Sequence, residues 1–400
     1  MKKSKSKSSF TYQTDPRCGC APEARPIREH LEKGVVVLDK PAGPTSHEVV
    51  AWVKQILGLS KAAHTGTLDP NVTGVLPVLL GAARKLANCF VGDKEYVCVM
   101  KLHGEVGEGE GGEKGRGEAG GEAGGEAGGE AGGEAGGEAG REGGGEAAEA
   151  AVRRVCEEFV GRIYQRPPLK SAVKRRVRVR TVHYSEVKEV AGRKEGREVL
   201  LRVGCEAGTY IRMLCHHIGL VLGVGAHMSE LRRTKAFPFD ETGGLTRLQD
   251  LKDAFVFYEE TGDESLLRKL VVPIEFALRK AGLPSVVVKD SAVDAICHGA
   301  DLAAPGILQV GEKEGEEGKE EGKEEGKEEG KEEGKEEGKE EINTGDRVVI
   351  YTLKGEAVGV GRAKLSAEEM LKAEKGVCVE TERVFMKPGT YKRGWKSRGG

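Results

Sequence analysis

HTGTLDPNVTGVLP, residues 64–77, is the stretch on which the interpretation of the chain depends, because it sets one carboxylate, Asp69, in a loop between apolar segments. Gly66 and Gly74 permit backbone angles and close approaches that other residues resist, and Pro70 favours an extended conformation at Asp69. The loop is therefore suited to aiming a side chain, and Asp69 is the candidate nucleophile. The alternative is that Asp69 only closes an Asp-Pro-Asn turn.

Two motifs in this stretch, GTLDP and TGVLPV, resemble the signature of bacterial tRNA T-loop pseudouridine synthases and of their guide-RNA-directed archaeal and eukaryotic relatives. Further segments resemble the dyskerin family, the catalytic subunit of H/ACA ribonucleoproteins: GVVVLDKPAGPTSHEVVAWVK (34–54), KEYVCVMKLHGE (94–105), IYQRPPLKSAVKRR (163–176) and GTYIRMLCHHIGLVLGVGAHMSELRRT (208–234). The resemblance implies an α+β catalytic domain with a mixed, largely antiparallel sheet, followed by a small β-barrel-like PUA domain that binds RNA.

The predicted organisation has four parts: a basic N-terminal extension at 1–33, a catalytic domain at 34–283, a PUA domain at 284–391 and a tail at 392–400. Acidic low-complexity inserts interrupt the two domains at 105–149 and 311–341, where frequent glycine predicts flexible loops. The first insert has an alternative role as an electrostatic mimic of RNA. By resemblance, the N-terminal extension packs on the C-terminal module, and Lys392, in place of a proline, loosens the tail.

The charge balance indicates a polyanionic partner. The inserts carry net charges of −10 and −9 in a chain of −2, so the remaining residues carry +17. Lysine and arginine in such excess are typical of nucleic-acid binding, with a merely soluble basic protein as the alternative. Nine scattered cysteines predict a reducing compartment, and the Cys18-Gly-Cys20 pair alone does not predict a zinc site.

No signal peptide or membrane span is evident, so we expect a soluble intracellular protein. The lack of a long lysine-rich C-terminal tail favours archaeal cytoplasm over a nucleolus.

A cationic strand is predicted near residue 178. Arg176, Arg178 and Arg180 alternate with Val177 and Val179, so one face is apolar and the other basic. The acid-free run around them also contains Arg166, Lys170, Lys174 and Arg175. We expect Arg175, Arg176, Arg178 and Arg180 to bind RNA phosphates. The alternative is a solvated edge strand blunted by charge.

Local patterns place several further elements. Thr45 and Glu48 form a capping box at the start of a helix whose stripe of Val49, Trp52, Val53, Ile56 and Leu57 should be core. Strands are expected at 34–38 and 199–205, and helices at 152–159, from 213 to 219–222, at 245–251 and at 264–278. The PUA part should contain strands at 286–288, 306–310, 347–351, 357–361 and 376–379, with a helix at 292–297.

The resemblance implies that uridine is isomerised to pseudouridine without a cofactor or metal. Asp69 would be the nucleophile, and Arg212 would keep it ionised in a dry pocket. Tyr96 would stack on the extruded uracil, and its hydroxyl would accept or donate a proton as the base detaches. Tyr210, Ile211 and Leu231 complete the expected base pocket, His64 holds the RNA, and Lys40 is a structural or phosphate contact. By residue type alone, Tyr96 would be an aromatic residue of the core, and Arg212 would form a structural salt bridge.

Three functions are compared. The first is the catalytic subunit of an H/ACA particle acting on rRNA, with tRNA as a further substrate. Its expected partners are an H/ACA guide RNA, the substrate RNA, a very small core protein, a small β-barrel accessory protein and a kink-turn-binding protein, with no membrane. The second is a stand-alone tRNA T-loop synthase. The third is a catalytically silent RNA-binding scaffold, which would not need Asp69, Tyr96 and Arg212 together.

Overall fold

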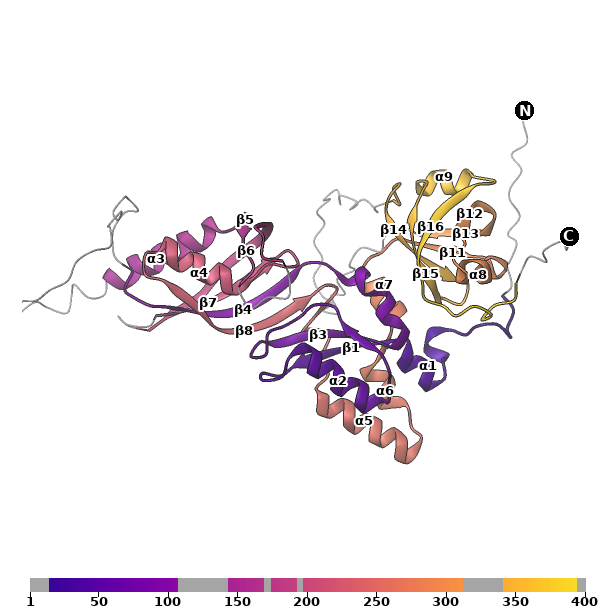
Figure 1. Ribbon diagram of the computed structural model, residues 1–400, viewed down its shortest axis with the longest axis horizontal. Helices are drawn as coiled ribbons and strands as arrows, with labels where there is room; N and C mark the ends of the chain where they lie inside the picture. The colour runs from indigo at the N-terminus through magenta and orange to yellow at the C-terminus, as the bar shows by residue number, and fades with distance from the viewer. Residues whose placement is uncertain (1–13, 107–142, 169–173, 193–196, 312–340, 394–400) are drawn as a thin grey trace, which may run out of the picture. The chain divides into compact units, whose positions relative to one another are not determined.

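The computed structural model of the chain describes residues 14–106, 143–168, 174–192, 197–311 and 341–393 (Figure 1). These residues belong to two compact units: unit 1 contains the chain up to Gly92 and from Lys235 onward, and unit 2 contains Asp93–Thr234. Most of the two predicted inserts lies outside the described residues, as do residues 1–13 of the extension, the tail from 394 and Lys170. Within the described ranges, no helix has the length and apolar character needed to cross a membrane.

The first sheet of unit 1 is built on two apolar strands, β1 (Gly34–Lys40) and β3 (Thr73–Leu80), which pair antiparallel with Val35 opposite Leu79. Because alternate residues of a strand face opposite sides, Val36 and Leu38 enter one hydrophobic cluster and Val35 enters another. Both faces are covered, which explains the nearly continuous apolar runs. The other strands are β2 (Ala62–His64) on β3, β10 (Val272–Pro273) on β1, and β9 (Phe239–Asp240) on the end of β8 (Ala226–Ala236).

Helix α2 (Ser46–Leu57) begins with the predicted capping box. Thr45 Oγ1 accepts a hydrogen bond from the Glu48 amide at 3.1 Å, and the Glu48 carboxylate accepts one from the Thr45 amide at 2.7 Å. The predicted apolar stripe packs into the core except at Trp52, which is 43% exposed. The expectation that Trp52 is core is therefore wrong: it lines a surface groove beside α5 (Leu248–Thr261).

Residues 264–278 do not form one helix as expected. Helix α6 (Ser265–Leu270) ends before the short strand β10, and α7 (Ile274–Lys280) begins after it. The break follows from a distant contact, because β10 pairs with Gly34 and Val35 of β1. Helix α5 also begins three residues later than expected and continues to Thr261. The remaining helical segments of this part are η1 (Pro22–Ala24), α1 (Ile27–Glu32) and η2 (Gly81–Phe90).

A second sheet of unit 1 has six strands in the order β12-β16-β15-β14-β11-β13, antiparallel except for the β11–β14 pair. Its strands are β11 (Ser285–Val288), β12 (Leu302–Ala303), β13 (Ile307–Gly311), β14 (Arg347–Thr352), β15 (Ala357–Ala363) and β16 (Val377–Val384). Its helical segments are α8 (Asp290–Cys297), η4 (Ala304–Gly306) and α9 (Ala367–Lys372). The predicted strand set is confirmed, whereas β12 and α9 were not predicted.

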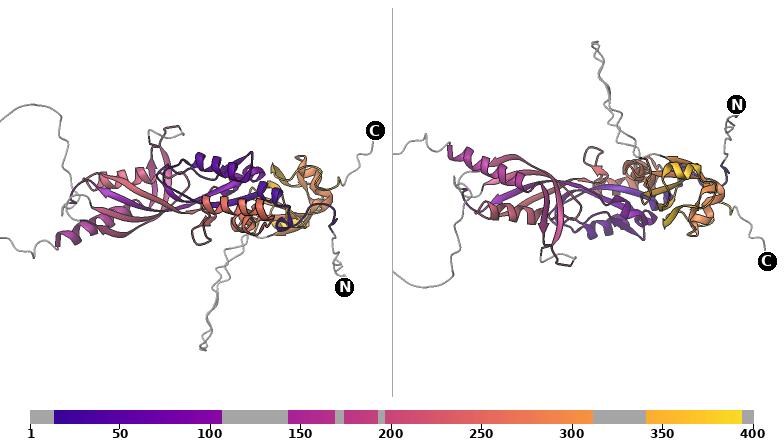
Figure 2. Two further views of the ribbon diagram at one scale, coloured as in Figure 1. Left: turned by 90° about the horizontal axis from the view of Figure 1, so that it is seen from below. Right: turned by 90° about the horizontal axis from the view of Figure 1, so that it is seen from above.

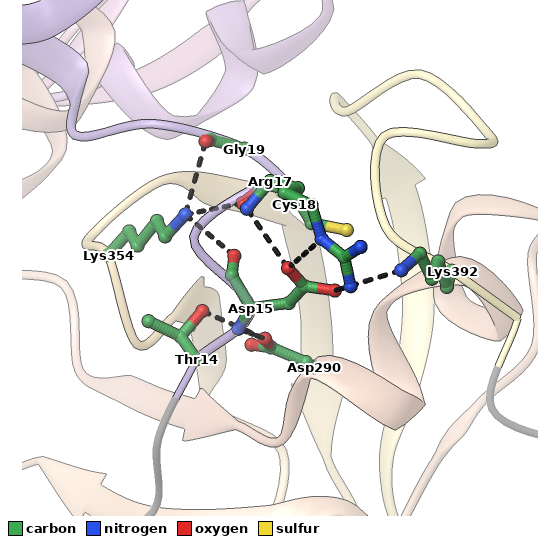
Figure 3. A network of polar contacts seen from close by, with 8 residues as sticks. All are labelled: Thr14, Asp15, Arg17, Cys18, Gly19, Asp290, Lys354 and Lys392. Carbon is green, nitrogen blue, oxygen red and sulfur yellow. Dashed lines mark hydrogen bonds and ion pairs between the residues drawn. The ribbon is translucent and has the colours of Figure 1, made fainter.

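Residues 14–20, which we call the N-terminal strap, lie against this six-stranded sheet (Figures 1 and 2). The ammonium group of Lys354 donates hydrogen bonds at 3.0, 2.5 and 3.2 Å to the main-chain carbonyls of Asp15, Cys18 and Gly19 (Figure 3). Lys392 Nζ lies 3.0 Å from Asp15 Oδ2. For these residues the expected packing of the extension on the C-terminal module is confirmed. Lys392 also contacts the strap, while the tail from 394, which Lys392 was expected to loosen, lies outside the described residues.

Unit 2 is a sheet in the order β8-β4-β7-β6-β5 with α3 (Gly143–Glu158) and α4 (Ile211–Val221) packed on it (Figure 1). The strands besides β8 are β4 (Lys94–Leu102), β5 (Gly161–Gln165), β6 (Arg178–Ala191) and β7 (Glu198–Cys205). The sulfur atoms of Cys98 on β4 and Cys215 on α4 are 3.9 Å apart in the core.

Three boundaries in unit 2 differ from expectation. Helix α3 starts at Gly143, inside the predicted flexible insert, and from Glu146 onward its sequence is rich in glutamate and alanine, which favour helix. Strand β6 starts only at Arg178, so Arg176 and Val177 precede the strand. Helix α4 begins at Ile211, two residues earlier than expected.

Candidate active site

The loop of Asp69 connects β2 to β3. The amide of Val72 donates a 3.1 Å hydrogen bond to the carbonyl of Asp69, so the backbone does form the turn considered as an alternative. The Asp69 side chain takes no part in that bond, and the residue is exposed to solvent. The backbone alone therefore closes the turn, and the carboxylate is not needed for it.

Lys40 is completely buried beneath this loop. Its ammonium group donates hydrogen bonds to the carbonyls of Pro41 at 2.9 Å, Pro70 at 2.8 Å and Val72 at 2.8 Å. Two of these carbonyls belong to residues that follow Asp69 in the loop, Pro70 and Val72, and the Pro70 carbonyl also accepts from the Gly43 amide at 2.9 Å. The expectation of a phosphate contact is corrected, because a side chain with no exposed surface cannot reach RNA. The structural alternative for Lys40 is the right one.

Ser46 fixes the other side of the loop. Its hydroxyl accepts a 2.8 Å hydrogen bond from the amide of Leu68 and donates a 3.0 Å bond to the carbonyl of the same residue. Ser46 and Leu68 are both buried. The residue preceding Asp69 is thus held by both of its polar main-chain groups.

His64 ends β2 at the entrance to the loop. It pairs with Val78 of β3, and the following amide, of Thr65, donates a 3.1 Å bond to the carbonyl of Pro77. Its ring contacts that of His47 edge to face, with centroids 5.1 Å apart. His64 is half-buried and His47 is exposed at the first turn of α2.

Tyr96 lies on β4 in unit 2 and is only 7% exposed. Its side chain is hydrogen-bonded to Arg233 of β8, which is fully buried. Burial lowers the pKa of the Arg233 guanidinium, and the contact with Tyr96 opposes that change. Leu231, on the same face of β8 by alternation, is half-buried.

The start of α4 carries three of the predicted residues. Gln165 exchanges two hydrogen bonds with the main chain of Tyr210, donating to its carbonyl at 3.2 Å and accepting from its amide at 2.9 Å. This contact fixes the residue that precedes the helix. Ile211 is buried, while Arg212 is exposed on the first turn.

The predicted RNA-binding arginines occupy two environments. Arg175 and Arg176 are exposed ahead of β6, whereas Arg178 and Arg180 are half-buried on the strand. The guanidinium of Arg180 lies 3.2 Å from the Glu206 carboxylate. Arg175 and Arg176 therefore present the more accessible charges of this run.

The predicted site residues are divided between the two units. Asp69, His64 and Lys40 belong to unit 1, and the others belong to unit 2. The pairing of Asp69 with Arg212 joins residues of different units and stays a prediction.

Sequence reasoning missed Ser46 and Arg233. The two-residue alternation from Leu231 could have placed Arg233 on the same strand face.

Four protein families match segments of the sequence. They are the DKCLD (NUC011) domain over 5–50, the N-terminal domain of TruB family pseudouridylate synthases over 54–116, the C-terminal domain of tRNA pseudouridylate synthase B over 212–279, and the PUA domain over 284–318 and 337–385. Together they describe an RNA-modifying isomerase with an attached PUA module.

Relatives match over nearly the whole chain. The "Probable tRNA pseudouridine synthase B" of Methanopyrus kandleri is 48% identical over 96% of this chain and 91% of its own length. The protein of the same name from Methanosarcina barkeri is 46% identical over 96% and 92%. The chain belongs to the TruB family of pseudouridine synthases.

Solved structures give the same family. A chain in the crystal structure of a Cbf5-Nop10-Gar1 complex is 44% identical, with a TM-score of 0.70 and coverage of 95% of this chain and 93% of the other. A chain in an H/ACA RNP bound to a substrate RNA containing 2'-deoxyuridine is 42% identical, with a TM-score of 0.70 and coverage of 96% and 95%.

Proposed function

We propose that this protein is the catalytic subunit of an H/ACA guide-RNA particle that isomerises uridines of rRNA, with Asp69 as the nucleophile. One observation carries the proposal: the chain matches the chains of a Cbf5-Nop10-Gar1 complex and of an H/ACA RNP over 95% and 96% of its length. Partners resembling those named with the similar structures, Nop10 and Gar1, and an H/ACA guide RNA follow from the same match.

The chemistry needs an ionised carboxylate in a pocket without water. Asp69 is exposed in the free protein, so we expect bound RNA to help close the pocket around it. Arg212 would then oppose the rise in the pKa of Asp69 that desolvation causes. Tyr96, Tyr210, Ile211 and Leu231 would enclose the extruded uracil, and His64 would hold the RNA beside the loop. Arg175 and Arg176 would contact phosphates, with Arg178 and Arg180 further along the same run.

A stand-alone tRNA synthase is the second candidate, because the curated relatives carry the name tRNA pseudouridine synthase B. The two candidates differ in whether a guide RNA is required. We would measure tritium release from RNA labelled at uracil C5, using an rRNA fragment complementary to a guide RNA and, separately, a tRNA.

If the enzyme requires a guide RNA, we expect tritium release from the rRNA fragment only when guide RNA and partner proteins are present. Release from tRNA by the protein alone would support the second candidate. The absence of release from either substrate, in every mixture, would contradict both candidates and leave the RNA-binding scaffold.

A further inference from the structure

A buried arginine and a buried tyrosine meet in unit 2. Arg233 has no exposed surface and Tyr96 is 7% exposed, and they come from the adjacent strands β8 and β4. Arginine is almost never fully buried unless specific contacts replace the lost hydration. The hydrogen bond to Tyr96 is one such contact, so the two side chains form a buried polar pair.

The direction of this hydrogen bond follows from the chemistry of the two groups. A guanidinium has only donors, so the oxygen of Tyr96 must accept the bond. The hydrogen of the Tyr96 hydroxyl is then left to point at another group. Arg233 therefore fixes the orientation in which Tyr96 presents its hydroxyl.

A second cation lies near the same pair. Lys94 precedes Tyr96 by two residues on β4, which puts both side chains on one face of the strand. Burial lowers the pKa of Lys94, and the positive charge of Arg233 lowers it further. Lys94 and Arg233 are thus close enough to interact, and Lys94 lies on the face of β4 that carries Tyr96.

Side chains on the opposite face of the sheet also form hydrogen bonds between neighbouring strands. Glu95 and Thr234 are the sequence neighbours of Tyr96 and Arg233, so they face the other side. Thr234 Oγ1 donates a 2.7 Å hydrogen bond to Glu95 Oε1, and Arg202 donates a 2.8 Å bond to Glu95 Oε2. The bond of Thr234 therefore joins β8 to β4 on the face opposite the buried pair, whereas the bond of Arg202 joins β7 to β4.

The hydroxyl of Tyr184 on β6 also donates a hydrogen bond to Glu95 Oε2. Its ring lies directly over Gly204, where an added Cβ would come within 2.3 Å of the ring. Gly204 pairs with Glu95 across β7 and β4 and with Tyr184 across β7 and β6. A glycine is needed there, because any side chain would displace the ring that covers the carboxylate.

We infer that Arg233 is a positioning residue of the pseudouridine synthase: its guanidinium holds the hydroxyl of Tyr96 in one orientation towards the target uridine. Arg233 acts through Tyr96 and does not touch the RNA. The inference rests on the proposed role of Tyr96, because a tyrosine outside the site would need no orientation.

Single-turnover tritium release tests the inference with Arg233→Met, Arg233→Lys, Tyr96→Phe and the double variant Tyr96→Phe/Arg233→Met. Arg233→Met should slow the chemical step about 100-fold while the KM for RNA changes by less than about threefold, because the misplaced group is needed only during reaction. Arg233→Lys should be partly active. The double variant should be no slower than Tyr96→Phe, since both substitutions remove one interaction.

The matched control is Arg202→Met, which removes another arginine from the same sheet on the opposite face. It should destabilise the protein yet keep the rate within about threefold of wild type. A fluorine signal from 3-fluorotyrosine at position 96, assigned by its loss in Tyr96→Phe, should shift in Arg233→Met and Arg233→Lys and stay in place in Arg202→Met. This signal still tests the contact in Arg233→Lys if Arg233→Met fails to fold.

Three results would overturn the inference: a wild-type rate in folded Arg233→Met, a double variant slower than Tyr96→Phe by the full effect of Arg233→Met, or an unmoved fluorine signal. A wild-type rate in Tyr96→Phe would overturn the role of Tyr96 together with that of Arg233. None of these results bears on the role of Asp69 as the nucleophile, which is tested separately by the rate of tritium release in Asp69→Asn.

Discussion

Two lysines, Lys40 under the Asp69 loop and Lys354 under the N-terminal strap, make the same set of bonds. Each donates three hydrogen bonds to main-chain carbonyls. Lys40 has no exposed surface, whereas Lys354 is half-buried at the sheet surface (Figure 3). Water can therefore replace the donor at the strap but not at the loop.

The same hydrogen-bonding arrangement therefore has different energetic consequences at the two places. A carbonyl that loses its partner inside the core retains the full penalty of desolvation, about 1–3 kcal/mol, while a solvated one regains a bond to water. The loop that carries Asp69 is accordingly held in one geometry, and the strap is attached by contacts that can be exchanged. Substitutions at the two places should therefore differ in both stability and activity.

Lys40→Met should have the largest effect. It removes the shared donor of three carbonyls, so we expect a loss of about 3 kcal/mol or more in the free energy of unfolding. The rate of tritium release should fall at least about 100-fold in the fraction that folds, because the tip carrying Asp69 is no longer fixed. Urea denaturation and single-turnover kinetics measure the two effects. A wild-type rate would mean that Lys40 does not position the loop.

Ser46→Ala should have the next largest effect. It leaves the buried amide and carbonyl of Leu68 without their partner, at a cost of about 1–3 kcal/mol. Thr45→Ala is the matched control, since it removes the adjacent helix cap at a cost of about 1 kcal/mol and does not touch the loop. We expect Ser46→Ala to lower the rate and Thr45→Ala to leave it unchanged. Equal rates in the two variants would show that the Ser46 contact serves stability alone.

Lys354→Met should lower the free energy of unfolding by only about 1 kcal/mol, because solvent replaces the ammonium group. Proteolysis near residues 14–20 should become faster, and the rate of tritium release should stay within about twofold of wild type. Limited proteolysis followed by mass spectrometry measures the release of the strap. A loss of activity as large as that of Lys40→Met would remove the distinction between the two lysines.

The smallest effect concerns acid pH and Asp15. Hydrogen bonds from Arg17 lower the pKa of Asp15, and Lys392 lowers it further. A carboxyl whose pKa is lower when folded contributes stability above its unfolded pKa of about 3.9 and loses that contribution as the pH falls below it. Asp15→Asn should therefore have a slightly lower Tm than wild type at pH 6. The difference should shrink below about pH 4, and a constant difference down to pH 2 would contradict the assignment.

Local sequence patterns were sufficient to predict those elements whose interacting residues lie close together in the sequence. The capping box of Thr45 and Glu48 spans four residues, and the β-branched run at 34–38 predicted most of β1. The motifs around Asp69 and the end of β8 were also sufficient to identify the family.

Distant partners account for what the sequence did not predict. A lysine in an Asp-Lys-Pro turn is expected at the surface. Lys40 is buried because it bonds to carbonyls 30 and 32 residues away in the sequence. Arg233 follows another arginine in a basic motif, so nothing local predicts its burial against Tyr96 of β4. The break between α6 and α7 arises in the same way, because β10 pairs with β1 from the start of the chain.

Tritium release by Asp69→Asn is the most direct test of the central claim. Asparagine keeps the shape of the side chain and removes the charge, and Asp253→Asn on the exposed face of α5 is the matched control. We predict no release from Asp69→Asn above background and wild-type release from Asp253→Asn, with RNA binding retained in both. Release from Asp69→Asn at the wild-type rate would contradict the assignment of Asp69 as the nucleophile.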